Sequence, residues 1–216
     1  MAKVKTRGTT VADLLVAQIV EAGAKRIYGI VGDSLNPVVD AVRRAAKDGV
    51  DIEWVHVRHE EAAAFAAAAE AEVTGNLAVC AGSCGPGNLH LINGLYDANR
   101  SKVPVLAIAS HIPSAQIGTS YFQETHPDRL FTECSVYSEM ISSAEQAPRV
   151  ITSAIHHAYG ALGVAVLTLP GDVADLDAPA PLASVTTRPP KPRVIPWSRS
   201  CARRSGRSTR RCSPPR

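Results

Sequence analysis

Two adjacent glutamates, Glu60 and Glu61, begin the alanine-rich segment "EEAAAFAAAAEAEVTG". Adjacent helix positions point about 100° apart, so one carboxylate can face a buried pocket while the other faces water. One interpretation is that both only stabilise the positive end of the helix dipole. The other is that one of them lies in a poorly solvated pocket, where a carboxyl group can exchange a proton with a ligand.

A glycine-rich stretch, "GSCGPGNLHLING" at 82–94, follows an apolar run and opens a predicted helix. Turns of this kind expose backbone N–H groups and allow a ligand to approach the chain closely, although they also occur as tight packing turns. The stretch is neither a Rossmann G-x-G-x-x-G motif nor a P-loop. Cys84 is not in a nucleophile elbow, because Pro86 stands where the second glycine would be.

Two further segments carry polar groups at positions suited to a ligand. In "YGIVGDSLN" (28–36), Asp33 and Ser34 either cap the following helix or approach a ligand beyond a strand end. In the long polar loop containing "SYFQETHP" (120–127), Phe122 offers an apolar wall and Gln123 an amide.

Neither the histidines nor the cysteines predict a metal site. Cys80 and Cys84 have no nearby Cys/His set with zinc spacing, and five cysteines, an odd number without regular spacing, fit a reducing, cytoplasmic setting. Metal spacing is also absent among the remaining candidates, which we interpret as structural or surface histidines: His56, His59, His90 and His111.

Helical and strand patterns alternate along the first 170 residues, beginning with a capping box at Thr10 and Asp13. Apolar runs predict strands over 26–32, 52–57, 76–82, 103–110, 134–141 and 163–170. Amphipathic or apolar segments predict helices over 35–49, 59–73, 87–99 and 145–160. Continuous apolar strands alternating with helices indicate an α/β fold, a doubly wound, mostly parallel six-stranded sheet with helices on both faces. The polar segments above then share one edge, beyond the carboxyl ends of the strands.

The net charge of +3 is the sum of an acidic region and a strongly basic one. Residues 1–187 hold 13 Lys/Arg and 20 Asp/Glu, whereas 188–216 hold 10 Lys/Arg and no acid. We expect residues 179–216 to form a linker and a disordered basic tail, because they are rich in Arg, Pro and Ser and lack a core pattern. We expect no nucleic-acid partner, since the tail has no periodic apolar face, and no integral membrane segment, since no apolar run reaches about 18 residues.

Taken together, the motifs resemble the N-terminal pyrimidine-binding domain of thiamine diphosphate enzymes, over about residues 8–178. "RHEEAAAFAAAAEA" and "GSCGPGNLHLINGL" carry the resemblance to the superfamily, and "GDSLN" and "YFQETHP" make the chain similar to the pyruvate oxidase and pyruvate:quinone dehydrogenase branch. The resemblance implies that Glu60 is the catalytic glutamate, which hydrogen-bonds N1′ of the cofactor's aminopyrimidine and promotes removal of the thiazolium C2 proton. Glu61 is then its solvated neighbour.

The resemblance also assigns the other site residues. Phe122 and Gln123 would form a substrate pocket for pyruvate. Cofactor-binding roles fall to eight residues: Asp33, Ser34, Gly82, Ser83, Gly85, Pro86, Gly87 and Asn88.

The family's Mg²⁺ and diphosphate site, its FAD domain and its C-terminal membrane-binding helix have no counterpart in this sequence. We therefore expect little activity from the chain alone, and completion of the site by a homodimer, a homotetramer or a separate chain. An acetolactate synthase-like domain, another 2-keto acid decarboxylase domain and a non-catalytic truncated module are the alternatives.

Overall fold

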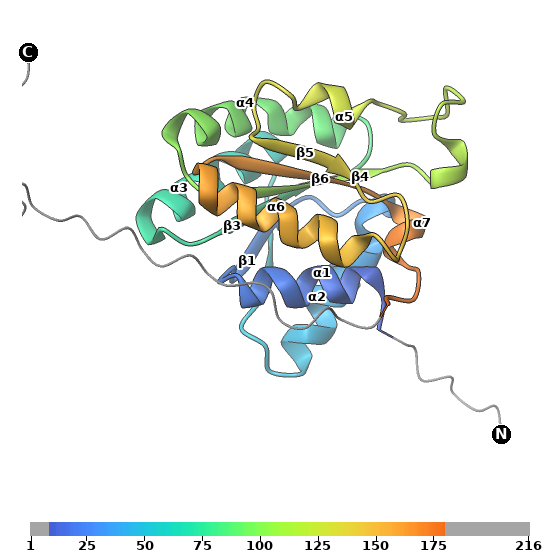
Figure 1. Ribbon diagram of the computed structural model, residues 1–216, viewed down its shortest axis with the longest axis horizontal. Helices are drawn as coiled ribbons and strands as arrows, with labels where there is room; N and C mark the ends of the chain where they lie inside the picture. The colour runs from blue at the N-terminus through green and yellow to red at the C-terminus, as the bar shows by residue number, and fades with distance from the viewer. Residues whose placement is uncertain (1–8, 180–216) are drawn as a thin grey trace, which may run out of the picture.

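The computed structural model describes residues 9–179, to which all structural statements refer (Figure 1). The strands are β1 (Arg26–Gly29), β2 (Glu53–His56), β3 (Ala78–Gly82), β4 (Val105–His111), β5 (Tyr137–Met140) and β6 (Val164–Pro170). The α-helices are α1 (Val11–Glu21), α2 (Asn36–Lys47), α3 (Glu60–Thr74), α4 (Pro86–Ser101), α5 (Pro127–Leu130), α6 (Ala147–Ala161) and α7 (Gly171–Ala174). Two 3₁₀ turns, η1 (Asp33–Leu35) and η2 (Ser114–Gln116), follow β1 and β4.

All six strands form one parallel sheet in the order β2-β1-β3-β4-β6-β5. The inner strands β3, β4 and β6 are buried at every position, as continuous apolar runs predict. The edge strands β2 and β5 have four residues each and are partly exposed. The predicted doubly wound α/β fold is therefore confirmed, and every predicted strand is present, though each is shorter than predicted.

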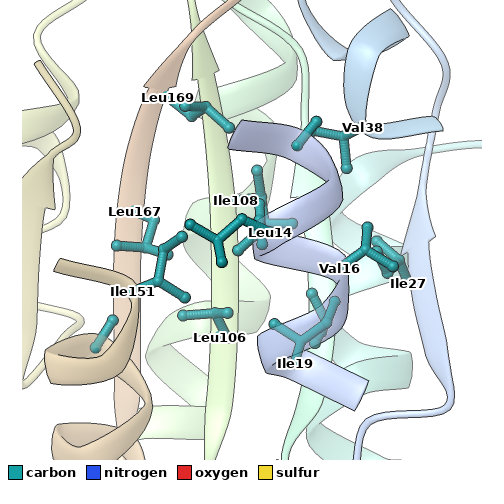
Figure 2. Packing of buried hydrophobic residues seen from close by; sticks show 14 of the residues in the cluster. Leu14, Val16, Ile19, Ile27, Val38, Leu106, Ile108, Ile151, Leu167 and Leu169 are labelled. Atoms are coloured by element: carbon teal, nitrogen blue, oxygen red, sulfur yellow. The ribbon is translucent and has the colours of Figure 1, made fainter. Parts of the chain in front are cut away.

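Helices cover both faces of the sheet and enclose two cores (Figure 1). On one face, α1, α2 and α6 place branched aliphatic side chains against the strands. Figure 2 shows Leu14 and Ile19 of α1 beside Leu106 and Ile108 of β4, with Ile151 of α6 alongside. On the other face, α3 and α4 contribute mainly alanine, with Leu91 and Leu95 of α4.

The chain enters and leaves the domain at one place. Thr10 caps α1 through the predicted capping box with Asp13, and it forms an isolated antiparallel bridge with Asp177. The predicted domain limits, 8–178, stay a prediction, and nearly all of the predicted tail lies outside the described residues. Within 9–179, no helix is long and apolar enough to cross a membrane.

Candidate active site

The polar segments singled out in the sequence meet where the chain reverses its winding. The connection after β1 leads to α2 on one face, and the connection after β3 leads to α4 on the other. Ligands of open α/β sheets bind in the crevice at such a switch point. Here the two connections touch, because the backbone N–H of Cys84 donates to Ser34 Oγ at 3.1 Å, and a Cβ on Gly32 would lie 2.7 Å from Ser83 Cβ.

Glu60 is the first residue of α3 and is only 6% exposed, whereas Glu61 is partly exposed. The two glutamates thus occupy different environments, as their spacing on a helix predicts. Asn93 Nδ2 of α4 donates to Glu61 Oε1 at 3.2 Å. Glu60 is therefore the only one of the two that is enclosed by the protein.

Two histidines surround the Glu60 carboxylate. His90 Nδ1 lies 3.1 Å from Glu60 Oε2, and the His90 ring stacks on the His59 ring with centroids 4.4 Å apart. His59 caps α3, since its Nδ1 accepts from the backbone N–H of Glu61 at 3.2 Å. The His90 contact fixes the orientation of the buried carboxyl group.

The glycine-rich turn presses against Glu60 from the other side. A Cβ on Gly87 would lie 3.2 Å from Glu60 Oε1 and 2.7 Å from Ser83 Oγ, so only glycine allows the turn to pack this closely. Gly85 is the N-cap residue of α4 at φ 69°, ψ −120°, and a Cβ there would meet Gln123 Cβ at 2.9 Å. The turn is therefore a close approach of backbone to side chains, as a ligand-proximal turn requires.

Hydrogen bonds tie three connections together behind the turn. The Asn88 side chain is fully buried and donates through Nδ2 to the Ser110 carbonyl at 2.7 Å. Ser110 Oγ in turn donates to the Ser34 carbonyl at 2.6 Å. Asn88 thus fixes α4 to the end of β4, and η1 is held in place by Ser110.

A cavity of about 390 Å³ lies on the β4 and β6 side of the turn. Its lining includes five residues predicted or discussed above: Asp33, Ser34, Cys84, Phe122 and Gln123. The Cys84 thiol donates to Gln123 Oε1 at 3.4 Å, while Phe122 is 79% exposed. Glu60 is not among the lining residues, so the structure places the predicted site in two adjoining parts.

Two lining groups of this cavity were not predicted. His111 ends β4, is 2% exposed, and its burial lowers its pKa. Asp172 follows β6, and burial acts to raise its pKa, but hydrogen bonds from the Ser114 side chain and backbone hold it below its ordinary value. Their positions, at the carboxyl end of β4 and just past that of β6, are the sequence signal that could have revealed them.

One sequence interpretation is wrong. Neither Asp33 nor Ser34 caps α2, because the helix begins after η1 with Leu35 at its N-cap and no side-chain cap. The Ser34 hydroxyl instead accepts a hydrogen bond from the Cys84 backbone N–H, which holds the connection after β1 against the connection after β3.

Comparison with known proteins identifies the family. Residues 9–130 match the model of the thiamine pyrophosphate enzyme N-terminal TPP binding domain. The chain belongs to this family. Thiamine pyrophosphate is another name for thiamine diphosphate.

Three relatives show the breadth of the match. The chain is 63% identical over 185 residues to an uncharacterized 42.6 kDa protein of Pseudomonas amyloderamosa, covering 84% of this chain and 46% of that protein. It is 40% identical to pyruvate oxidase of Lactiplantibacillus plantarum, and the match covers 82% of this chain and 29% of that enzyme. It is 34% identical to acetolactate synthase of Arthrospira platensis, and the match covers 79% of this chain and 30% of that enzyme. The chain thus spans less than half the length of these relatives.

The site has the features that an aminopyrimidine requires. The ring needs a carboxyl group screened from water, and Glu60 is buried and oriented by His90. It also needs backbone close to that carboxyl, and Gly87 allows this approach, since a Cβ there would lie 3.2 Å from Glu60 Oε1. The residues present therefore fit the pyrimidine end of thiamine diphosphate.

Proposed function

We propose that this domain holds the aminopyrimidine of thiamine diphosphate against Glu60 and is the pyrimidine-binding part of a pyruvate-oxidising enzyme. The observation that carries the proposal is the buried Glu60 carboxylate, which faces the glycine-rich turn at the switch point of the sheet. The 40% identity to a pyruvate oxidase supports pyruvate oxidation, and the 34–36% identity to acetolactate synthases keeps acetolactate formation as the second candidate.

The chemical roles in this proposal follow from the surroundings of each group. When bound, the cofactor supplies an electron sink for decarboxylation of a 2-keto acid. Glu60 shares a proton with a ring nitrogen, His90 orients the carboxyl group, and the buried surroundings exclude water. Gly87 lets the turn approach Glu60 Oε1 closely, and Ser83 Oγ lies on the same side of Gly87 as that oxygen.

Pyruvate would enter the adjoining cavity, where the Gln123 amide and the Ser34 hydroxyl offer hydrogen bonds and Phe122 an apolar edge. Oxidation of the product carbon to acetate would require the FAD, and the diphosphate would require Mg²⁺. We propose that both groups are held by domains of the kind that fill the remaining length of the relatives. A second copy in a homodimer or homotetramer, or a separate chain, would supply them.

The test is direct binding of thiamine diphosphate to the 216-residue chain, measured by calorimetry and by saturation-transfer NMR of the ring protons. We expect Glu60→Gln to weaken binding at least tenfold. Glu61→Gln is the matched control, because it removes the neighbouring carboxylate in the partly exposed position, and it should bind like the unmodified chain. Equal binding by the Glu60→Gln variant, or no binding by the unmodified chain, would refute the pyrimidine contact.

A further inference from the structure

Two imidazoles and one carboxylate meet at the beginnings of α3 and α4. His59, Glu60 and His90 each offer one ligand atom, and these three atoms lie within 4.8 Å of one another. Along the chain His59 and His90 are far apart and show no metal spacing. They meet because β2 and β3 are parallel strands whose following helices begin at the same edge and lie on the same face.

This donor set suits a divalent transition metal. Imidazole nitrogen and carboxylate oxygen are the usual zinc ligands outside cysteine sites, at about 2.0–2.2 Å from the ion. Two ligands of one tetrahedral ion then lie about 3.3 Å apart, close to the 3.1 Å between His90 Nδ1 and Glu60 Oε2. Mg²⁺ prefers an all-oxygen shell, so this cluster does not suit the cofactor's own cation.

The cluster can close around an ion with side-chain movement alone. The His59 and His90 side chains are 48% and 44% exposed, which leaves both rings room to turn. The buried Glu60 provides a fixed anionic ligand, and the carboxylate of Glu61, with Oε2 at 3.8 Å from His59 Nδ1, adds a second negative charge beside the site.

We propose that His59, Glu60 and His90 bind Zn²⁺ or a similar divalent transition-metal ion. We further propose that this ion competes with the aminopyrimidine for Glu60, a part that rests on the proposed function. Metal binding would end the role of His59 as the cap of α3. In the structure, His59 Nδ1 accepts a hydrogen bond from the Glu61 backbone N–H. Ligation through Nδ1 uses that lone pair, and ligation through Nε2 moves the ring proton onto Nδ1, so the capping bond is lost either way.

The first experiment titrates the 216-residue chain with ZnCl₂ by calorimetry, without any thiamine compound. We expect His59→Gln and His90→Gln each to weaken binding at least tenfold. The matched control is His56→Gln, since His56 ends β2 and lies outside the cluster. Co²⁺ in place of Zn²⁺ should give a visible spectrum without thiolate charge transfer, which excludes the cysteines as ligands. The ¹H–¹⁵N resonance of the Glu61 amide should shift on metal addition.

Equal Zn²⁺ binding by the His59→Gln, His90→Gln and unmodified chains would overturn the site, as would no binding by the unmodified chain. The second experiment adds thiamine, which lacks the metal-chelating diphosphate. Zn²⁺ should raise the apparent Kd of thiamine for the unmodified chain but not for His59→Gln, and no change for either would overturn the competition. Zinc binding without thiamine binding would leave the metal site standing while the proposed function fails, so the two failures are distinguishable.

Discussion

The Tyr159 hydroxyl joins three elements of the domain through two buried hydrogen bonds. It donates to the carbonyl of Ala22, after α1, and accepts from the backbone N–H of Leu77, just before β3, both at 2.7 Å. Ala22 is fully buried and Leu77 is 1% exposed, so water cannot replace the lost partner. Tyr159→Phe leaves one donor and one acceptor unsatisfied, each costing about 1–3 kcal/mol. We therefore expect the free energy of unfolding to fall by about 2–6 kcal/mol.

Urea unfolding followed by circular dichroism measures this loss. Tyr96→Phe is the matched control, since the Tyr96 hydroxyl donates to Glu133 Oε2 at 2.8 Å on the exposed side of α4. That change should stay within about 0.5 kcal/mol, as exposed substitutions usually do. If Tyr159→Phe cost no more than Tyr96→Phe at an unchanged m-value, the two buried bonds would contribute nothing net, and the reasoning would be refuted.

Three further predictions concern packing and titration. Gly94→Ala should destabilise the domain by about 1–3 kcal/mol in thermal or urea unfolding, because the new Cβ would lie 2.5 Å from Ala64 Cβ. Gly160→Ala on α6 is the control: its Cβ would meet no atom within 4 Å, so this variant should be neutral or stabilising. Burial lowers the pKa of His111, so the folded state favours the neutral ring. The free energy of unfolding should therefore be at its maximum above the ordinary pKa of about 6.5 and should fall as the pH drops towards the lower pKa of the folded state. His111→Gln should flatten that part of the pH–stability curve, and an unchanged slope would contradict the assignment. Burial raises the pKa of Cys80 to about 12 and of Cys134 to about 11, so mass mapping should find both unalkylated at pH 8 in the native chain and alkylated in urea.

The layered fold could be predicted from the sequence because each strand carries its own burial signal. The uninterrupted apolar residues of β3, β4 and β6 indicated strands covered on both faces, and all three are fully buried. The ends of elements were less predictable. Apolar character continues past Gly29 to Val31, but the pairing of β1 with β2 and β3 ends at Gly29, and Val31 is 46% exposed. Hydrogen-bond pairing, which the sequence does not display, decides such limits.

The site was predictable as an edge of the sheet but not as a set of contacts. The parallel strands place Glu60, Ser34 and the glycine-rich turn at one edge of the sheet. This placement could be predicted from the alternation of strands and helices in the sequence. The pairing of Glu60 with His90 additionally requires that α3 and α4 lie on the same face and in a particular register. The mistaken capping role of Ser34 has a similar cause, because an intervening 3₁₀ turn moved the start of α2 past it.

The alanine-rich composition of α3 explains how a helix can begin with a buried carboxylate. Ala64 lies one turn after Glu60, and it contacts α4 where a Cβ on Gly94 would be only 2.5 Å from Ala64 Cβ and 2.8 Å from the Phe65 backbone nitrogen. Gly87 and Gly94 are seven residues apart and share one face of α4, so the same close backbone approach continues from Ala64 up to Glu60. Larger side chains along this seam would separate the helices and withdraw the glycine-rich turn from the carboxylate. Gly94→Ala should therefore also weaken the contact between Glu60 and His90, which the NMR resonances of the His90 ring would report.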